Sequence, residues 1–298
     1  MTVRRRGGTT WLALVALLVA LGAVGLVTSR VDEPGLGAVV ELAGAPCEGH
    51  ELRRTADDQG SPLICTQGDG GWRWEMRPVD APPRPVVVYY SDSLGVESVP
   101  VTRFVLGDQV DLVHRGYPGS ALCDWYDQVR QDLDVLRPDL VIAEFIGNES
   151  RPCLGDVDGD PVALVDRYRT DAREVERLHV HAGVRLVWLE APRSLVERVA
   201  RVQDGIEAAF AEGAVVEPLV EVADPGAVLE DGDGEGVWRL PCAAWETVRD
   251  GCAGRTIAVR HIDGTHLCSG GDGDSCGEYA AGQFRYGAAV ADVVIARL

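Results

Sequence analysis

The chain has 298 residues, of which 46% are hydrophobic and 25% are charged, which allows a globular protein with a large buried core. Its formal net charge of −19 argues against a nucleic-acid partner, because proteins that bind nucleic acids carry clustered positive charge to neutralise the phosphates. We therefore predict a globular protein that binds neither DNA nor RNA.

The N-terminal residues 1–30 carry a membrane-targeting signal. Arg4, Arg5 and Arg6 precede an apolar core from Trp11 to Val27, whose 17 residues are at the lower limit of a membrane-spanning helix. The arginines are expected to stay in the cytoplasm, so the rest of the chain is expected outside it. Because no Ala-x-Ala cleavage site follows the core, we favour an uncleaved, single-pass signal anchor. Cleavage as a signal peptide would instead give a secreted protein.

Eight cysteines fit the oxidising environment outside the cytoplasm. They allow 105 pairings, and proximity in the sequence favours four local pairs: Cys47–Cys65, Cys123–Cys153, Cys242–Cys252 and Cys268–Cys276. No Cys-x-x-Cys spacing occurs, which argues against a structural zinc site.

Residues 31–84 form a second region, made of a juxtamembrane spacer, a small hairpin module and a Pro-rich linker. The hairpin is predicted from short strands at 63–66 and 72–74 around a Gly-Asp-Gly-Gly turn. An isolated hairpin is marginal in water, so a disulfide is expected to stabilise it. The region resembles a small Cys-stapled hairpin module of exported actinobacterial proteins.

From residue 85 to residue 298 predicted strands alternate with predicted helices. The strands are expected at 86–90, 110–114, 139–146, 184–189, 215–222 and 256–262, and the helices at 94–106, 124–136, 161–181, 195–210 and 279–298. Pro100 is expected to start or kink the first of these helices. This alternation predicts an α/β domain whose mostly parallel sheet is covered by helices on both faces.

Polar clusters follow four of these strands, at 91–95, 116–120, 147–150 and 263–266. Because the carboxyl ends of parallel strands meet at one edge of a sheet, the clusters are expected to converge there. Together they offer a serine (Ser93), a glycine amide, an asparagine amide, and an Asp and a His three residues apart. This is the set of groups that a serine hydrolase needs: nucleophile, oxyanion donors, base and orienting carboxylate.

The motifs Ser-Asp-Ser-Leu at 91–94, Gly119, Asn148 and Asp263-x-x-His266 resemble the four sequence blocks of the SGNH (GDSL-type) hydrolases. The resemblance implies a three-layer α/β/α fold with a flavodoxin-like sheet, and esterase, lipase or acyl-transfer activity on an acyl-ester substrate without a cofactor. It implies that Ser93 is the nucleophile, His266 the base and Asp263 its orienting group. The amides of Ser93 and Gly119 and the side chain of Asn148 would form the oxyanion hole. Two departures are Ser91, in place of the usual opening glycine, and Ile146–Glu149, a loose form of Gly-x-Asn-Asp.

Several other polar residues are interpreted as structural. Ser91 is expected to be a turn residue and His261 a packed or surface residue. Glu149 and Glu190 lie near strand ends, where they could touch substrate, but we favour solvated loop carboxylates. The acidic stretch 156–160 resembles a calcium loop but lacks the closing glutamate, so no metal site is predicted.

The leading hypothesis is a monomeric, extracytoplasmic serine esterase acting on acylated cell-envelope glycans or lipids. An O-acyltransferase that uses the same residues is one alternative. A non-catalytic surface protein that keeps the fold and binds glycan is the other.

Overall fold

The computed structural model describes residues 55–56, 62–68, 71–76, 84–155, 157, 159–246, 252, 256–267 and 280–298, all within one compact unit that spans residues 41–298. The expected membrane anchor at residues 1–30 lies outside the described residues. Within the described ranges, none of the helices combines the length and the apolar character that crossing a bilayer would require.

A sheet of five parallel strands forms the centre of the α/β domain. In chain order its strands are β4 (Val86–Ser91), β5 (Asp111–Gly116), β6 (Leu140–Glu144), β7 (Arg185–Leu189) and β8 (Val220–Ala223). They lie side by side in the order β5-β4-β6-β7-β8, and every neighbouring pair is parallel. Counted in chain order this is 2-1-3-4-5, the flavodoxin-like arrangement. The expected parallel, doubly covered sheet is therefore confirmed.

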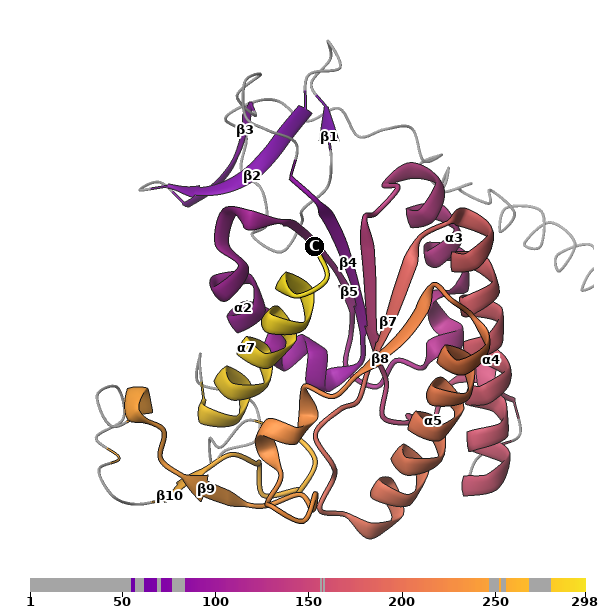
Figure 1. Ribbon diagram of the computed structural model, residues 1–298, viewed down its shortest axis with the longest axis vertical. Coiled ribbons are helices and arrows are strands. Elements are labelled where there is room, and N and C mark those ends of the chain that lie inside the picture. The colour runs from indigo at the N-terminus through magenta and orange to yellow at the C-terminus, as the bar shows by residue number, and fades with distance from the viewer. Residues whose placement is uncertain are drawn as a thin grey trace, which may run out of the picture. The chain divides into compact units, whose positions relative to one another are not determined.

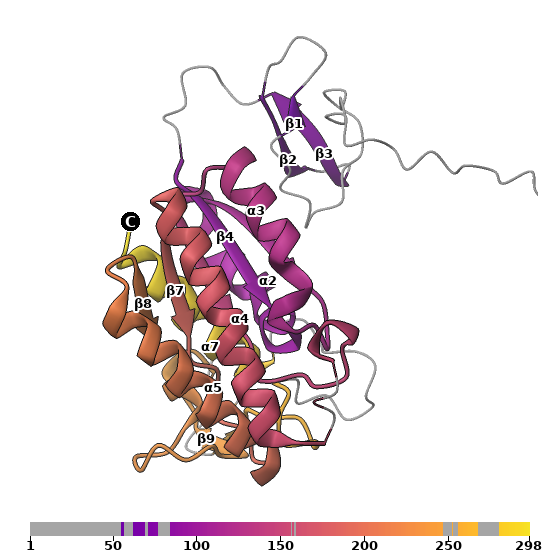
Figure 2. The same ribbon diagram turned by 90° about the vertical axis from the view of Figure 1, so that its right-hand side faces the viewer.

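Helices cover both faces of this sheet, giving three layers (Figures 1 and 2). The helices α2 (Ser93–Leu106) and α7 (Ala281–Ile295) lie on one face. The other face carries α3 (Tyr126–Val135), α4 (Pro161–Ala182) and α5 (Glu197–Val216). Short 3-10 turns are η1 (Gly107–Gln109), η2 (Leu122–Trp125), η3 (Pro152–Leu154) and η4 (Gly226–Leu229).

The strand β4 shows why the sequence forms a buried strand. All six of its residues are buried, because helices cover the sheet on both sides. Its side chains alternate between the two cores: Val88 and Tyr90 pack in the core on the α4 side, and Val87 and Tyr89 in the core on the α2 side.

A separate antiparallel sheet forms the predicted hairpin. It consists of β1 (Thr55–Ala56), β2 (Pro62–Gly68) and β3 (Gly71–Met76), and Gly68 is paired with Gly71 across the turn. The two expected strands are present, and β1 is a third strand that the sequence pattern did not predict.

Three details of the predicted elements differ from the structure. The strand expected at 215–222 begins only at Val220, because α5 continues to Val216 and is ended by Glu217 and Pro218. The strand expected at 256–262 is the short β10 (Thr256–Ala258), which pairs antiparallel with β9 (Arg239–Pro241) outside the main sheet. Pro100 does not start α2, because the helix begins seven residues earlier at Ser93, where the side chain of Asp92 accepts a hydrogen bond from the amide of Leu94; Pro100 lies inside the helix.

Disulfide bonds join Cys123 to Cys153 and Cys242 to Cys252, two of the four expected pairs. The other two expected pairs each include a cysteine outside the described residues, since Cys47, Cys268 and Cys276 are not described. The Cys123–Cys153 bond connects η2, after β5, to η3, after β6, and so ties together two of the segments that follow strands.

Candidate active site

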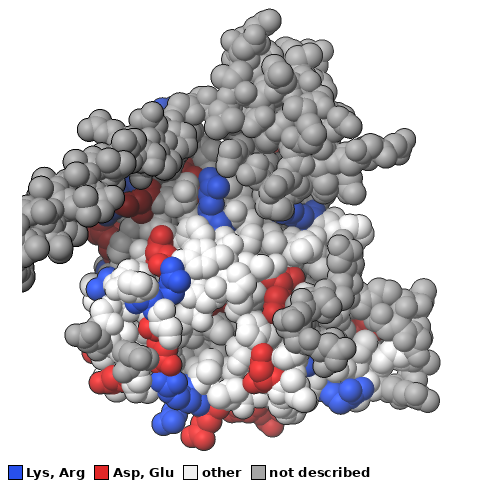
Figure 3. All heavy atoms as spheres, turned by 180° about the vertical axis from the view of Figure 1, so that it is seen from behind, with Lys and Arg blue, Asp and Glu red and all other residues white. Residues whose placement is uncertain are grey.

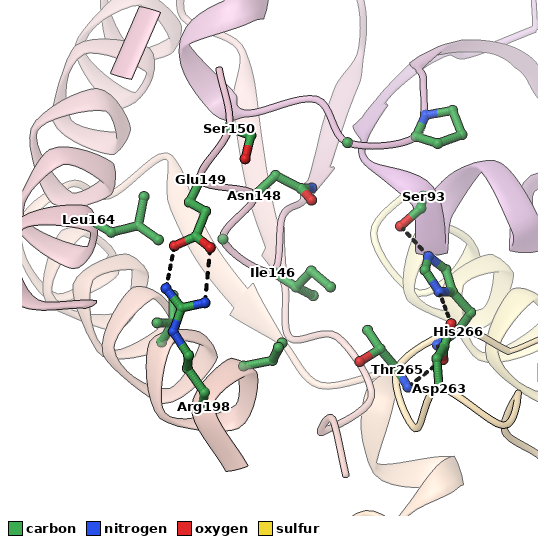
Figure 4. Close-up of a pocket in the computed structure, with 15 residues that line it drawn as sticks. Ser93, Ile146, Asn148, Glu149, Ser150, Leu164, Arg198, Asp263, Thr265 and His266 are labelled. Carbon is green, nitrogen blue, oxygen red and sulfur yellow. Dashed lines mark hydrogen bonds and ion pairs between the residues drawn. The ribbon is translucent and has the colours of Figure 1, made fainter. Parts of the chain in front are cut away.

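The order of the strands reverses between β4 and β6, since the chain goes from β4 outward to β5 and then returns to the other side of β4. In open α/β sheets a crevice forms at such a reversal, outside the carboxyl ends of the strands. A pocket of about 660 Å³ lies there, and the five predicted residues Ser93, Gly119, Asn148, Asp263 and His266 all line it (Figure 4).

Three of these residues form a continuous chain of hydrogen bonds (Figure 4). The Nε2 atom of His266 lies 3.1 Å from the hydroxyl of Ser93, and its Nδ1 atom lies 2.6 Å from Oδ2 of Asp263. Ser93 is 173 residues away from His266 in the sequence, so only the fold brings them together. In this arrangement the imidazole can take a proton from the serine while the carboxylate fixes the ring and its tautomer.

Asp263 is held as a carboxylate by its own loop. Burial disfavours its charge, but the amides of Thr265 and His266 donate to its Oδ1 at 2.9 and 3.0 Å and the His266 ring donates to Oδ2. These contacts outweigh burial and hold the pKa of Asp263 below its ordinary value. The group is therefore ionised at neutral pH and can stabilise a positive charge on His266.

The loop that carries Asp263 and His266 is fixed from several sides. The buried guanidinium of Arg260 donates to the carbonyls of Thr265 and Arg193, at 2.9 and 2.7 Å. The amide of Leu267, directly after His266, donates to the Glu97 carboxylate on α2 at 2.8 Å. These contacts hold the loop in place although the strand before it, β10, is not part of the main sheet.

His261, which was expected to be a packed or surface residue, is partly buried and also contacts Asp263. Its Nδ1 atom lies 3.0 Å from Oδ2 of Asp263, the same oxygen that His266 contacts. No pattern in the sequence predicts this contact, because it depends on the tight turn in which the amide of His261 donates to the carbonyl of His266.

A buried pair of carboxyl groups lies behind Ser93. Asp92 accepts hydrogen bonds from the amides of Leu94 and Ile146 and from the side chain of Asn148, and Glu144 accepts the amide of Gly95 at 3.0 Å. Burial raises the pKa of Asp92 to about 6, and burial together with the neighbouring Asp92 raises the pKa of Glu144 well above its ordinary value. Sequence reasoning missed Glu144, although a charged residue within an apolar strand was a visible signal.

The expected oxyanion donors lie on the same pocket, but Asn148 is already engaged. Its Nδ2 atom donates to Oδ2 of Asp92 at 3.1 Å and to the carbonyl of Ser120 at 3.0 Å. Both hydrogens of the amide are thus used within the protein. Asn148 could donate to a substrate only if one of these two hydrogen bonds breaks.

Ser91 is fully buried at the end of β4, and its hydroxyl lies 2.8 Å from Nε2 of His114. Ser91 was expected to be a turn residue, but it is the last residue of β4 and pairs with both neighbouring strands. Glu149 was expected to be solvated, but it forms an ion pair with Arg198.

Within the part of the chain that the structure describes, no three His, Cys, Asp or Glu side chains are grouped as metal ligands would be. Of the acidic stretch 156–160, Asp156 and Asp158 lie outside the described residues. On the face shown in Figure 3, blue and red side chains are interspersed in the part that is described.

No family model and no curated protein matches the chain. Among solved structures, it is similar to a putative arylesterase from Agrobacterium tumefaciens, with 17% identity, a TM-score of 0.46, and 72% of this chain and 100% of that chain covered. It is also similar to the C-terminal catalytic domain of peptidoglycan O-acetyltransferase A from Streptococcus pneumoniae (14% identity, TM-score 0.44, 72% and 94% covered). A third is a GDSL-like lipase from Bacteroides thetaiotaomicron (12% identity, TM-score 0.43, 72% and 89% covered). The chemistry assigned to this site therefore rests on the contacts of Ser93, His266 and Asp263.

Proposed function

We propose that this protein is a serine esterase that cleaves acyl esters through a covalent acyl-enzyme. One observation supports the proposal above all others: the hydroxyl of Ser93, the ring of His266 and the carboxylate of Asp263 are linked at 3.1 and 2.6 Å on the wall of a pocket. A hydroxyl, a base and an orienting carboxylate in this order are the groups that acyl transfer by a serine requires.

The reaction proceeds in two halves. Ser93 Oγ attacks the ester carbonyl while His266 Nε2 takes its proton, and the tetrahedral oxyanion is held by the amides of Ser93 and Gly119 and by the side chain of Asn148. His266 then returns the proton to the leaving alcohol, and the acyl group stays on Ser93. Water, deprotonated by His266, attacks the acyl-enzyme and releases the acid.

The ester is proposed to belong to an acylated glycan or lipid of the cell envelope, met outside the cytoplasm by a protein anchored through its N-terminal segment. The arginine-flanked apolar segment of the first 30 residues supports this location, as do the disulfides Cys123–Cys153 and Cys242–Cys252, which persist in oxidising compartments. All the groups required come from one chain, so a monomer suffices for the reaction.

The test is hydrolysis of a short-chain p-nitrophenyl ester by the full-length protein in mild detergent. The wild-type protein is expected to release nitrophenol, and the Ser93→Ala variant is expected to lose this activity. Activity that persists in the variant would show that Ser93 is not the nucleophile. If an added sugar acceptor suppresses hydrolysis and becomes acylated, the same site acts as a transferase.

A further inference from the structure

The pocket at Ser93 continues beyond the reacting groups. Figure 4 shows Ser93 and His266 on one side and the pair Glu149–Arg198 on the other. The rest of the wall includes the aliphatic side chains Ile146, Leu164, Val199 and Val202 together with polar residues such as Ser150 and Thr265. We call the part of the pocket that these four aliphatic side chains line its apolar end.

Three different elements build the apolar end. Ile146 lies just after β6, Leu164 lies in the first turn of α4, and Val199 and Val202 lie three residues apart on α5, so that they share one face of that helix. Ile146, Leu164 and Val202 are 7%, 1% and 5% exposed, so they belong to the packed core and not to a loose surface.

Gly147 allows the backbone after β6 to pack closely against α5. Its φ of +99° lies in the region that disfavours other residues, and a Cβ atom there would meet Val202 and Ile206 at 2.5 and 2.8 Å. The backbone between Ile146 and Asn148 therefore packs directly on α5, which places the aliphatic wall next to the candidate oxyanion donor.

An ion pair also lines the pocket, opposite Ser93 and His266. Both guanidinium nitrogens of Arg198 contact the carboxylate of Glu149, at 2.9 and 2.6 Å, and the hydrogen bonds from Arg198 hold the pKa of Glu149 below its ordinary value. The pair joins the loop after β6 to the first turn of α5. A ligand that reaches from Ser93 to this pair passes along the four aliphatic side chains.

We propose that this apolar end binds the acyl chain of the substrate, and that the substrate is an ester of an aliphatic acid longer than acetic acid. The inference rests on the proposed esterase function. A pocket of about 660 Å³ falls within the range of sites that enclose whole organic ligands, and an acetyl group would leave most of the aliphatic wall uncovered. Among the described residues that line the pocket there is no Phe, Tyr or Trp, so it lacks the aromatic surface on which a sugar ring could stack.

Each methylene group that the pocket buries should increase kcat/KM. Burial of one methylene is worth about 0.8 kcal/mol, which corresponds to roughly a fourfold change at 25 °C. Butyrate carries two more methylenes than acetate, so we expect kcat/KM to rise by roughly 15-fold from p-nitrophenyl acetate to the butyrate, and to rise further for the octanoate.

The test compares these three esters with the full-length wild-type protein and two variants of α5. Val199→Phe fills the apolar end and should lower the octanoate-to-acetate ratio of kcat/KM by at least tenfold. Val215→Phe is the matched control, because Val215 is on the same helix, is 88% exposed and does not line the pocket. The control should keep the wild-type ratio, and its thermal midpoint shows the effect of a new phenylalanine on the helix.

A second measurement separates this inference from the esterase proposal. Octanoate should bind the Ser93→Ala variant in calorimetry, and the added Val199→Phe substitution should weaken that binding at least tenfold. Two results overturn the acyl-chain site. One is hydrolysis of p-nitrophenyl acetate with no higher kcat/KM for the longer esters; the other is a higher kcat/KM for the longer esters that Val199→Phe leaves unchanged. If the protein cleaves no ester but binds octanoate, and Val199→Phe weakens that binding, the esterase proposal is overturned and the acyl-chain site is supported. Faster cleavage of acetylated oligosaccharides than of octanoate esters assigns the pocket to a glycan instead.

Discussion

At the scale of single residues, the site depends on how Asp263 controls His266. The carboxylate accepts hydrogen bonds from two backbone amides and lies next to the Nδ1 atoms of two imidazoles, those of His266 and His261. When Nδ1 of His266 donates to Asp263, the neutral ring presents the Nε2 lone pair to Ser93 and can act as a base.

Replacement of Asp263 by asparagine is expected to lower kcat by about three to four orders of magnitude, because the amide no longer favours the required tautomer or stabilises the imidazolium. The measurement is the rate of ester hydrolysis, and circular dichroism checks that the variant is folded like the wild-type protein. Asp233→Asn in an exposed loop is the control and should keep wild-type activity. A loss of less than tenfold in Asp263→Asn would contradict the proposed role.

Asn148 has a sharper test, because its amide already donates to Asp92 and to the carbonyl of Ser120. If it turns to the oxyanion during the reaction, Asn148→Ala should lower kcat by about 10²–10³ with little change in KM. If it only supports the two loops, the loss should stay below tenfold and the thermal midpoint should fall instead.

At the scale of elements, two helices on the same face of the sheet are held in unusually close contact. A Cβ atom on Gly287 of α7 would meet the carbonyl of Ser98 at 2.6 Å and Val101 at 2.8 Å, both on α2, and the hydroxyl of Thr102 donates to the Gly287 carbonyl. Because α2 begins with Ser93, this contact also helps to fix the position of Ser93.

Gly287→Ala is expected to destabilise the protein, because overpacking against a rigid backbone costs about 1–3 kcal/mol and exceeds the gain of about 1 kcal/mol in helix propensity. A thermal midpoint lowered by several degrees would agree with this. The matched control is Gly232→Ala, where no atom lies within 4 Å of the added methyl group. Equal midpoints for the two variants would show that α2 and α7 can separate freely.

The helix α5 carries a group whose titration should be visible in stability. Burial and the nearby carboxylates Glu190, Asp204 and Asp224 raise the pKa of Glu207 from its ordinary 4.5 to about 8, although the amide of Gln203 opposes the shift. The folded protein therefore holds a proton that the unfolded chain has lost, so the contribution of Glu207 to stability falls as pH rises from about 4.5 to about 8.

Glu207→Gln should consequently stabilise the protein at pH 9 by at least about 2 °C in thermal midpoint, and should have little effect at pH 4. Glu197→Gln, at an 89% exposed carboxylate on the same helix, controls for the loss of one negative charge. A gain for Glu207→Gln that is equal at both pH values would contradict the raised pKa.

At the scale of the whole molecule, the order of the elements could be predicted because the signals are local. The apolar run 86–90 bounded by a polar turn, and the long charged helix from Pro161, are visible in short windows of sequence. The four residues Ser93, Asn148, Asp263 and His266 could be named for the same reason. The parallel sheet brings the loops of Ser93 and Asn148 together, whereas the loop of Asp263 and His266 follows β10, outside that sheet.

The features that sequence reasoning missed depend on contacts between distant parts of the chain. Glu149 pairs with Arg198, 49 residues away, and Glu144 accepts the amide of Gly95 at the same separation. No local pattern encodes such pairs. Val215 and Val216 have the composition of a strand, but they remain in α5 because the next restriction on the backbone comes only at Pro218.

The central claim is that Ser93 is an activated nucleophile, and covalent labelling tests it most directly. A fluorophosphonate probe should add to the folded full-length protein at a single site, and mass spectrometry of the digest should place the adduct on the peptide that contains Ser93. Replacement of His266 by alanine should slow the labelling by orders of magnitude, because the hydroxyl then has no base. A folded protein that takes up no probe, or that takes it up at another residue, would contradict the account.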